Sequence, residues 1–135
     1  MASNPIMLKG RSVELTLTPH MFPDDDGYMD AELSAELRPD DQRLLFVETS
    51  VGLTDVPGFR KQLDALGQPG DAVLKDEFDT FVMEVTRTES RALHVDCRVN
   101  WRPAEGPVVA FSARYDIDED KLADISEQVR RWIGR

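Results

Sequence analysis

The segment LHVDCRVNWR (93–102) decides the fold of this chain, because apolar and polar residues alternate along its whole length. Successive side chains of an extended strand point to opposite faces, so a period of two indicates a strand with one buried face. The apolar residues are Leu93, Val95, Cys97, Val99 and Trp101, and the polar residues are His94, Asp96, Arg98, Asn100 and Arg102. A turn at 102–107, rich in Pro and Gly, leads into a second alternating run at 108–115, which predicts an antiparallel hairpin.

The same alternation appears upstream at 28–37, where Met29, Ala31 and Leu33 face one side and acidic residues face the other. Alanine and glutamate favour helices, so a helix is the competing interpretation. We give the period-two pattern more weight and predict a half-buried strand. Further runs predict five more strands at 6–8, 13–18, 44–51, 72–75 and 78–88.

Two segments have helical spacing instead. After Thr54 or Asp55 as the N-cap, four apolar residues fall on one helical face and Gly67 is placed to end the helix. The second helix is predicted over 119–133. The apolar residues are Val56, Phe59, Leu63 and Leu66 in the first helix, and Leu122, Ile125, Val129 and either Trp132 or Ile133 in the second.

The predicted order is therefore four strands, a helix, four strands and a helix. Short connections between consecutive strands favour an antiparallel meander. We expect a single α+β domain over 1–135, a curved antiparallel sheet of about eight strands with both helices packed on its apolar side.

Composition is that of a folded protein, with 135 residues of which 41% are hydrophobic and 31% charged. The first residues lack the pattern of a secretory signal, and no apolar run approaches the ~20 residues of a membrane helix. Cys97 is the only cysteine, which excludes an internal disulfide and fits a reducing compartment. A cytoplasmic protein without a membrane segment is expected.

Negative charge is concentrated in one part of the chain. The net charge is -10, and residues 20–59 hold ten acidic residues against two arginines. Such a region repels nucleic acid and attracts a basic protein, although solubility alone is the simpler explanation. The residues predicted to bind a basic protein partner are Asp24, Asp25, Asp26, Asp30, Glu32 and Glu36.

The closing stretch Asp116-Ile117-Asp118-Glu119-Asp120 has the spacing of a calcium loop, with Glu127 at the twelfth position. The sixth position, where the loop needs glycine, is Lys121, and a helical apolar stripe follows it. We therefore predict that Asp118 caps the last helix. Two histidines and one cysteine also exclude a histidine-rich or zinc-knuckle site, so no metal and no cofactor are expected.

The polar face of 93–102 offers an alternative site. His94, Arg98 and Arg102 share that face, and Arg114 on the next strand joins them, so an anionic ligand or substrate is conceivable there. The ordinary explanation is the solvent-facing side of an antiparallel sheet. No phosphate loop, nucleophile elbow or paired catalytic signature is present, and a non-enzymatic protein is expected.

A family resemblance agrees with that expectation. The order of a hairpin, an acidic-faced strand, Phe59-Arg60-Lys61-Gln62-Leu63 on a short helix, Glu84-Val85 on a long strand and a closing Ile117-Asp118…Leu122…Ile125…Val129…Trp132 is similar to that of small bacterial immunity proteins of the WapI type. The resemblance covers nearly the whole chain. It implies a cytosolic binder without catalytic residues, which either neutralises a toxin or acts within a small gene cassette. Homodimerisation through a strand edge or a helix stays open.

Overall fold

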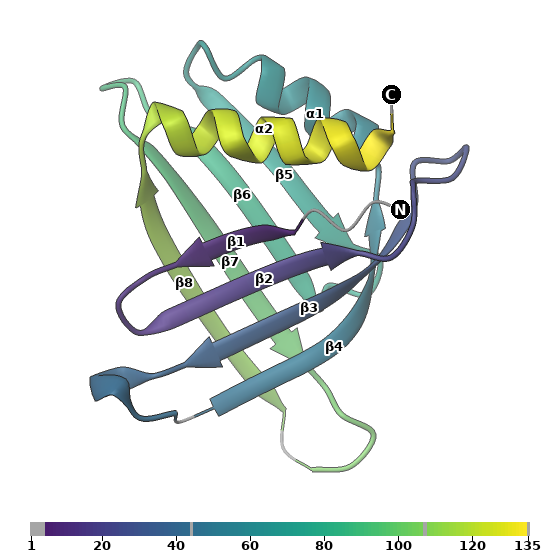
Figure 1. Ribbon diagram of the computed structural model, residues 1–135, viewed down its shortest axis with the longest axis vertical. Coiled ribbons are helices and arrows are strands. Elements are labelled where there is room, and N and C mark those ends of the chain that lie inside the picture. The colour runs from purple at the N-terminus through teal and green to yellow at the C-terminus, as the bar shows by residue number, and fades with distance from the viewer. Residues whose placement is uncertain (1–4, 44, 107, 135) are drawn as a thin grey trace.

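The computed structural model describes residues 5–43, 45–106 and 108–134, and its strands form one eight-stranded antiparallel sheet in sequence order (Figure 1). The strands are β1 (Ile6–Lys9), β2 (Val13–Pro19), β3 (Met29–Leu37), β4 (Leu45–Thr54), β5 (Gly70–Asp76), β6 (Phe81–Arg87), β7 (Leu93–Trp101) and β8 (Val109–Ile117). Helix α1 (Val56–Asp64) follows β4, and α2 (Glu119–Ile133) follows β8. A short 3-10 turn, η1 (Pro39–Asp41), lies between β3 and β4. The predicted α+β class and element order are confirmed.

The sheet bends between β4 and β5, where only two residue pairs join the strands. Figure 1 shows β1–β4 lying across β5–β8, with α1 and α2 together at one end. The Tyr115 hydroxyl on β8 donates to the carbonyl of Val13 on β2 (3.2 Å), so the two halves meet. Their inward side chains form one core cluster with those of the helices. Each half of the sheet therefore helps to cover the apolar face of the other. The sequence predicts that the helices alone cover that face.

The alternating segments form strands with the predicted faces. Met29, Ala31, Leu33 and Ala35 of β3 are 0% exposed, which excludes the helical interpretation of 28–37. In β7, the inward residues from Val95 to Val99 are buried to the same degree. Burial of a full apolar row on each central strand supplies most of the stabilisation, at about 25 cal/mol per Å² of apolar surface.

Helix α1 differs slightly from its prediction. Its N-cap is Asp55, whose carboxylate accepts a hydrogen bond from the Gly58 amide (3.2 Å). The helix ends at Asp64, before Gly67, and Leu66 beyond its end still lies in the core. The Gln62 side chain accepts from the Val73 amide of β5 (2.8 Å), so α1 covers a part of β5 that β4 does not reach.

Helix α2 begins as predicted. The Asp118 carboxylate accepts from the Lys121 amide (2.8 Å), and Gly134 closes the helix with a φ of 77°. Residues 119–127 are helical, so their carboxylates point outward along a rod and do not wrap an ion. The calcium spacing of this stretch is therefore incidental.

Some strand boundaries differ from those predicted from the sequence. The predicted start of the fourth strand at Leu44 lies outside the described residues, as do residues 1–4 and Pro107, and the strand continues to Thr54. Strand β6 begins at Phe81 and not at Phe78, because the buried Asp76 carboxylate accepts from the Phe81 amide (2.9 Å) across a turn. Phe78 lies in that turn and is 78% exposed. Among the residues with a described position, no helix is long and apolar enough to span a bilayer.

Candidate functional site

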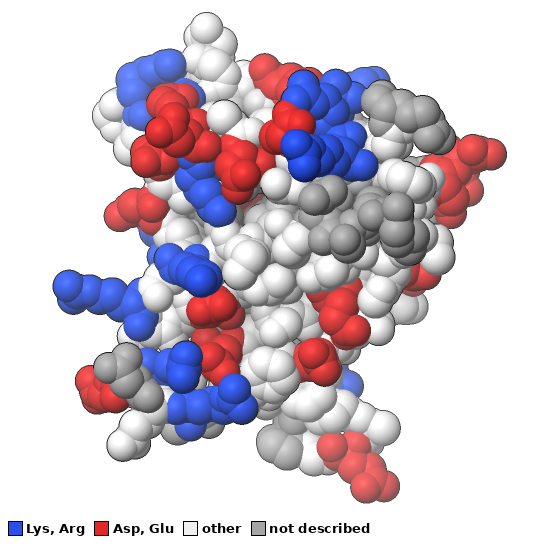
Figure 2. Space-filling view, viewed as in Figure 1, with Lys and Arg blue, Asp and Glu red and all other residues white. Residues whose placement is uncertain are grey.

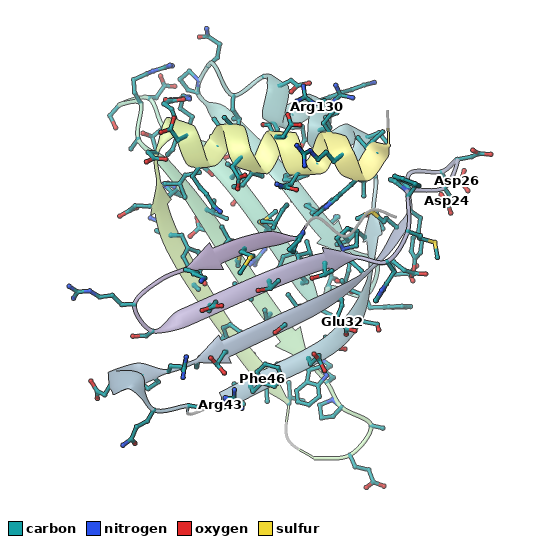
Figure 3. All side chains as sticks on the ribbon, in the orientation of Figure 1. Asp24, Asp26, Glu32, Arg43, Phe46 and Arg130 are labelled. Atoms are coloured by element: carbon teal, nitrogen blue, oxygen red, sulfur yellow. The ribbon has the colours of Figure 1, made fainter. Side chains whose placement is uncertain are left out.

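The acidic loop between β2 and β3 is held by one of its own aspartates. The Asp24 carboxylate accepts from the amides of Asp26 (2.9 Å) and Tyr28 (3.0 Å), while Gly27 has a φ of 81°. Figure 3 shows Asp24 and Asp26 on a loop that projects from one end of the sheet. Asp24 therefore stabilises the turn, and the side chains of Asp25 and Asp26 are directed to solvent.

The acidic residues of β3 separate into two environments. Asp30, Glu32 and Glu36 share its outer face, and Glu32 lies 3.9 Å from the His20 ring. Glu36, at the other end of the strand, is paired with Arg38 (3.2 Å) and Arg43 (2.6 Å).

Charge on the outer face of β1–β4 is therefore divided along the strands. In Figure 2 the blue groups of this sheet gather at its left end together with red groups, whereas the charged groups toward the right, where the acidic loop projects, are mostly red. We call the four acids at that end, Asp25, Asp26, Asp30 and Glu32, the acidic end of the sheet. Glu36 is neutralised and Asp24 is engaged in the turn, so only four of the six predicted residues remain available to a partner.

Tyr28 borders the acidic end and has a structural task. Its ring lies over Gly52, where an added Cβ would stand 2.0 Å from the phenol oxygen. The hydroxyl donates to Glu77 (3.1 Å). Desolvation, followed by this hydrogen bond to a carboxylate, raises the pKa of Tyr28 to about 12.

The polar face of β6–β8 holds the alternative set of predicted residues. Arg114 binds Asp96 through two nitrogen–oxygen contacts (2.7 and 3.2 Å), and His94 lies 3.5 Å from the same carboxylate. The hydrogen bond to Asp96 raises the pKa of Arg114. Arg102 follows the end of β7 and belongs to the loop, so it does not share the strand face as expected.

Arg98 is the remaining member of that set. It is exposed and has no ion pair or side-chain hydrogen bond within the part of the chain that the structure describes. It lines an open groove of about 650 Å³ on the outer face of the sheet. The groove is lined by Asp79, Val82, Arg98, Val99, Asn100, Ala110, Phe111 and Ser112.

A second groove of about 490 Å³ runs between the edge of β1 and the end of β8. Lys121 of α2 donates to the carbonyl of Met7 (2.7 Å) there, so the helix supplies a partner to the unpaired edge of β1. This contact connects the first strand to the last helix and is structural.

Arg87 is a buried charged residue that the sequence analysis did not single out. Arg87 is 3% exposed and donates to the carbonyl of Leu66 and, through both terminal nitrogens, to Glu119 (2.7 and 2.8 Å). The hydrogen bond from Arg87 lowers the pKa of Glu119, and the same contact raises the pKa of Arg87. The signal was available, because Arg87 occupies the next inward position after Phe81, Met83 and Val85. Arg87 therefore links β6 to the start of α2 and to the segment that follows α1, which is a structural role.

Within the described ranges, no three His, Cys, Asp or Glu side chains come together in a way that would hold an ion. Cys97 is buried, and burial followed by the charge of Asp96 raises the pKa of its thiol to about 12, which keeps it unreactive.

Comparison with known proteins establishes a similarity of fold only. No family model and no curated protein matches the chain. A solved structure of trypanosoma bruciei MRP1/MRP2 superposes with a TM-score of 0.54 at 12% identity, over 97% of this chain and 83% of that one. The chain shares that fold. At this identity the similarity concerns backbone architecture alone.

Proposed function

We propose that this protein is a non-enzymatic interaction domain that binds a basic protein through the acidic end of its first four strands. The observation that supports the proposal is the division of charge along β3. Glu36 is neutralised by two arginines, whereas Asp25 and Asp26 have no hydrogen-bonded side chain among the described residues. No lysine or arginine among the described residues pairs with the four acids of the acidic end, so their negative charge is not offset there.

The chemistry of such a surface favours lysine- and arginine-rich partners. Carboxylates accept bidentate hydrogen bonds from guanidinium groups, and a group of like charges accelerates encounter with an opposite one. The resemblance to WapI-type immunity proteins supports a cytoplasmic role in which the partner is a toxin. A buried free thiol at Cys97 is compatible with a reducing compartment.

Salt dependence tests the proposal. The protein is immobilised, exposed to a lysate of its source cell and, separately, to an oligoarginine peptide, at 0.05 M and at about 1 M salt, where the Debye length falls to about 3 Å. The acidic-end variant carries Asp25→Asn, Asp26→Asn, Asp30→Asn and Glu32→Gln. A matched control removes four exposed carboxylates elsewhere, at Asp64, Glu89, Glu105 and Asp120.

We expect a partner that is captured by wild type and by the control, and that is released by high salt. The acidic-end variant should bind it at least about fourfold more weakly, since four exposed ion pairs at about 0.2–1 kcal/mol each sum to about 0.8–4 kcal/mol. A partner that is retained equally by the acidic-end variant, or that ignores salt, would contradict the proposal. Equal loss with the control variant would attribute binding to net charge and not to this surface.

A further inference from the structure

We propose that the groove around Arg98 binds a small monocarboxylate with an apolar body. This site lies on the outer face of β6–β8 and is separate from the acidic end of β1–β4, so it goes beyond the interaction proposed above. The ligand class follows from the charge, the neighbours and the lining of the groove.

Arg98 is an exposed arginine without an ion pair or side-chain hydrogen bond among the described residues. Across the sheet its neighbours are Val82 on β6 and Ser112 on β8, neither of which carries charge. Two residues earlier on the strand, Asp96 is already engaged by Arg114 and His94. The Arg98 guanidinium is therefore a planar donor that is free, within the described residues, to take a carboxylate through two parallel hydrogen bonds.

The rest of the lining sets the other features of the ligand. The outward side chains of Val82 and Ala110 contribute apolar surface, and the Asn100 amide and Ser112 hydroxyl contribute hydrogen-bonding groups beside the guanidinium. Binding pockets combine a mainly apolar lining with a few polar groups that fix orientation. A small apolar body attached to one carboxylate matches this arrangement.

Asp79 limits the charge that the groove accepts. Its carboxylate belongs to the same lining, so the groove contains one cation and one anion. A dianion would face repulsion from Asp79, whereas a monoanion can be held by Arg98 with less opposition. Phosphate is therefore disfavoured relative to a monocarboxylate.

The experiment is a titration of ¹⁵N-labelled protein followed by backbone amide shifts. Phenylacetate is the probe, 2-phenylethanol supplies the same ring without charge, and inorganic phosphate supplies charge without the ring. Arg98→Gln removes the proposed donor. Arg114→Gln is the matched control, because Arg114 is exposed on the same face but is paired with Asp96 outside the groove.

We expect phenylacetate to shift the amides of residues 98–100 and 110–112 in wild type and in Arg114→Gln. Arg98→Gln should weaken this binding by about tenfold or more, the usual effect of losing a charge-assisted hydrogen bond. Asp79→Asn should tighten it severalfold, and asparagine tolerates the positive φ of 59° at that position.

Four results would overturn the proposal. One is no shift at these amides with phenylacetate at any accessible concentration. Two others are equal binding of 2-phenylethanol, which would make the charge irrelevant, and unchanged binding in Arg98→Gln. Tighter binding of phosphate than of phenylacetate would likewise reject the monocarboxylate class.

Discussion

Removal of the Asp118 cap is the sharpest test of how the last helix is held. The Asp118 carboxylate accepts from the Lys121 amide at 2.8 Å, and its backbone is extended, as an N-cap requires. Asp118→Ala leaves that amide without its side-chain partner and should lower the free energy of unfolding by about 1 kcal/mol. For a chain of this length the unfolding entropy is about 0.3 kcal/mol per degree, so the melting temperature should fall by about 3–4 °C.

Two further variants separate the hydrogen bond from the charge. Asp118→Asn keeps an acceptor of comparable capping strength and should stay within about 1 °C of wild type. Asp120→Ala removes an acid from the same first turn without removing a cap, and should cost about 0.3–0.5 kcal/mol through the helix dipole. Melting is followed by circular dichroism with and without calcium.

The reasoning is refuted if Asp118→Ala has the same melting temperature as wild type. It is also refuted if the melting temperature of Asp118→Asn falls as far as that of the alanine variant. A melting temperature that rises with calcium would restore the metal interpretation of 116–127, which the helical backbone argues against.

Three other predictions concern single contacts. Arg87 lowers the pKa of Glu119 in the folded protein below its unfolded value of about 4.3. The ionised Glu119 carboxylate therefore stabilises the fold above about pH 4.3, and this stabilisation is lost as the pH falls through the pKa of the folded state. Melting temperature measured between about pH 6 and pH 2.5 should therefore drop more steeply in wild type than in Glu119→Gln, and parallel curves would contradict the contact. Gly52→Ala should lower the melting temperature because its Cβ displaces the Tyr28 ring, and should add little in a Tyr28→Ala background; additive losses would show that the two sites are independent. A thiol reagent should label Cys97 at pH 8 only in denaturant, since the thiol is buried with a pKa of about 12, and rapid labelling of the native protein would contradict this burial.

Local pattern was sufficient for most of the fold. Strands β3 and β7 were predictable because a row of apolar side chains at period two has only one arrangement that buries it. The start of α2 was predictable because Asp118 precedes an uninterrupted apolar stripe at helical spacing. Boundaries were less certain where a side chain ends an element, as Asp76 does by binding the Phe81 amide.

The candidate sites depended on contacts that no local pattern contains. Sequence spacing placed His94, Arg98 and Arg114 near one another, but it did not show that Asp96 pairs with two of them and leaves Arg98 free. The sequence likewise grouped Glu36 with the other acids, and only the 3-10 turn after β3 brings Arg43 within 2.6 Å of its carboxylate.

The sequence by itself determined the class of this protein, the order of its elements and the face that each strand buries. These follow from the period of the apolar residues and from capping chemistry, both of which act over a few residues. Only the tertiary structure decided that the two halves of the sheet close over one core, that Arg87 links β6 to the start of α2, and which charges remain unpaired. Those outcomes rest on groups far apart in the chain, such as Val13 and Tyr115, which are 102 residues apart, and their distance in space is set by the packing of the whole core.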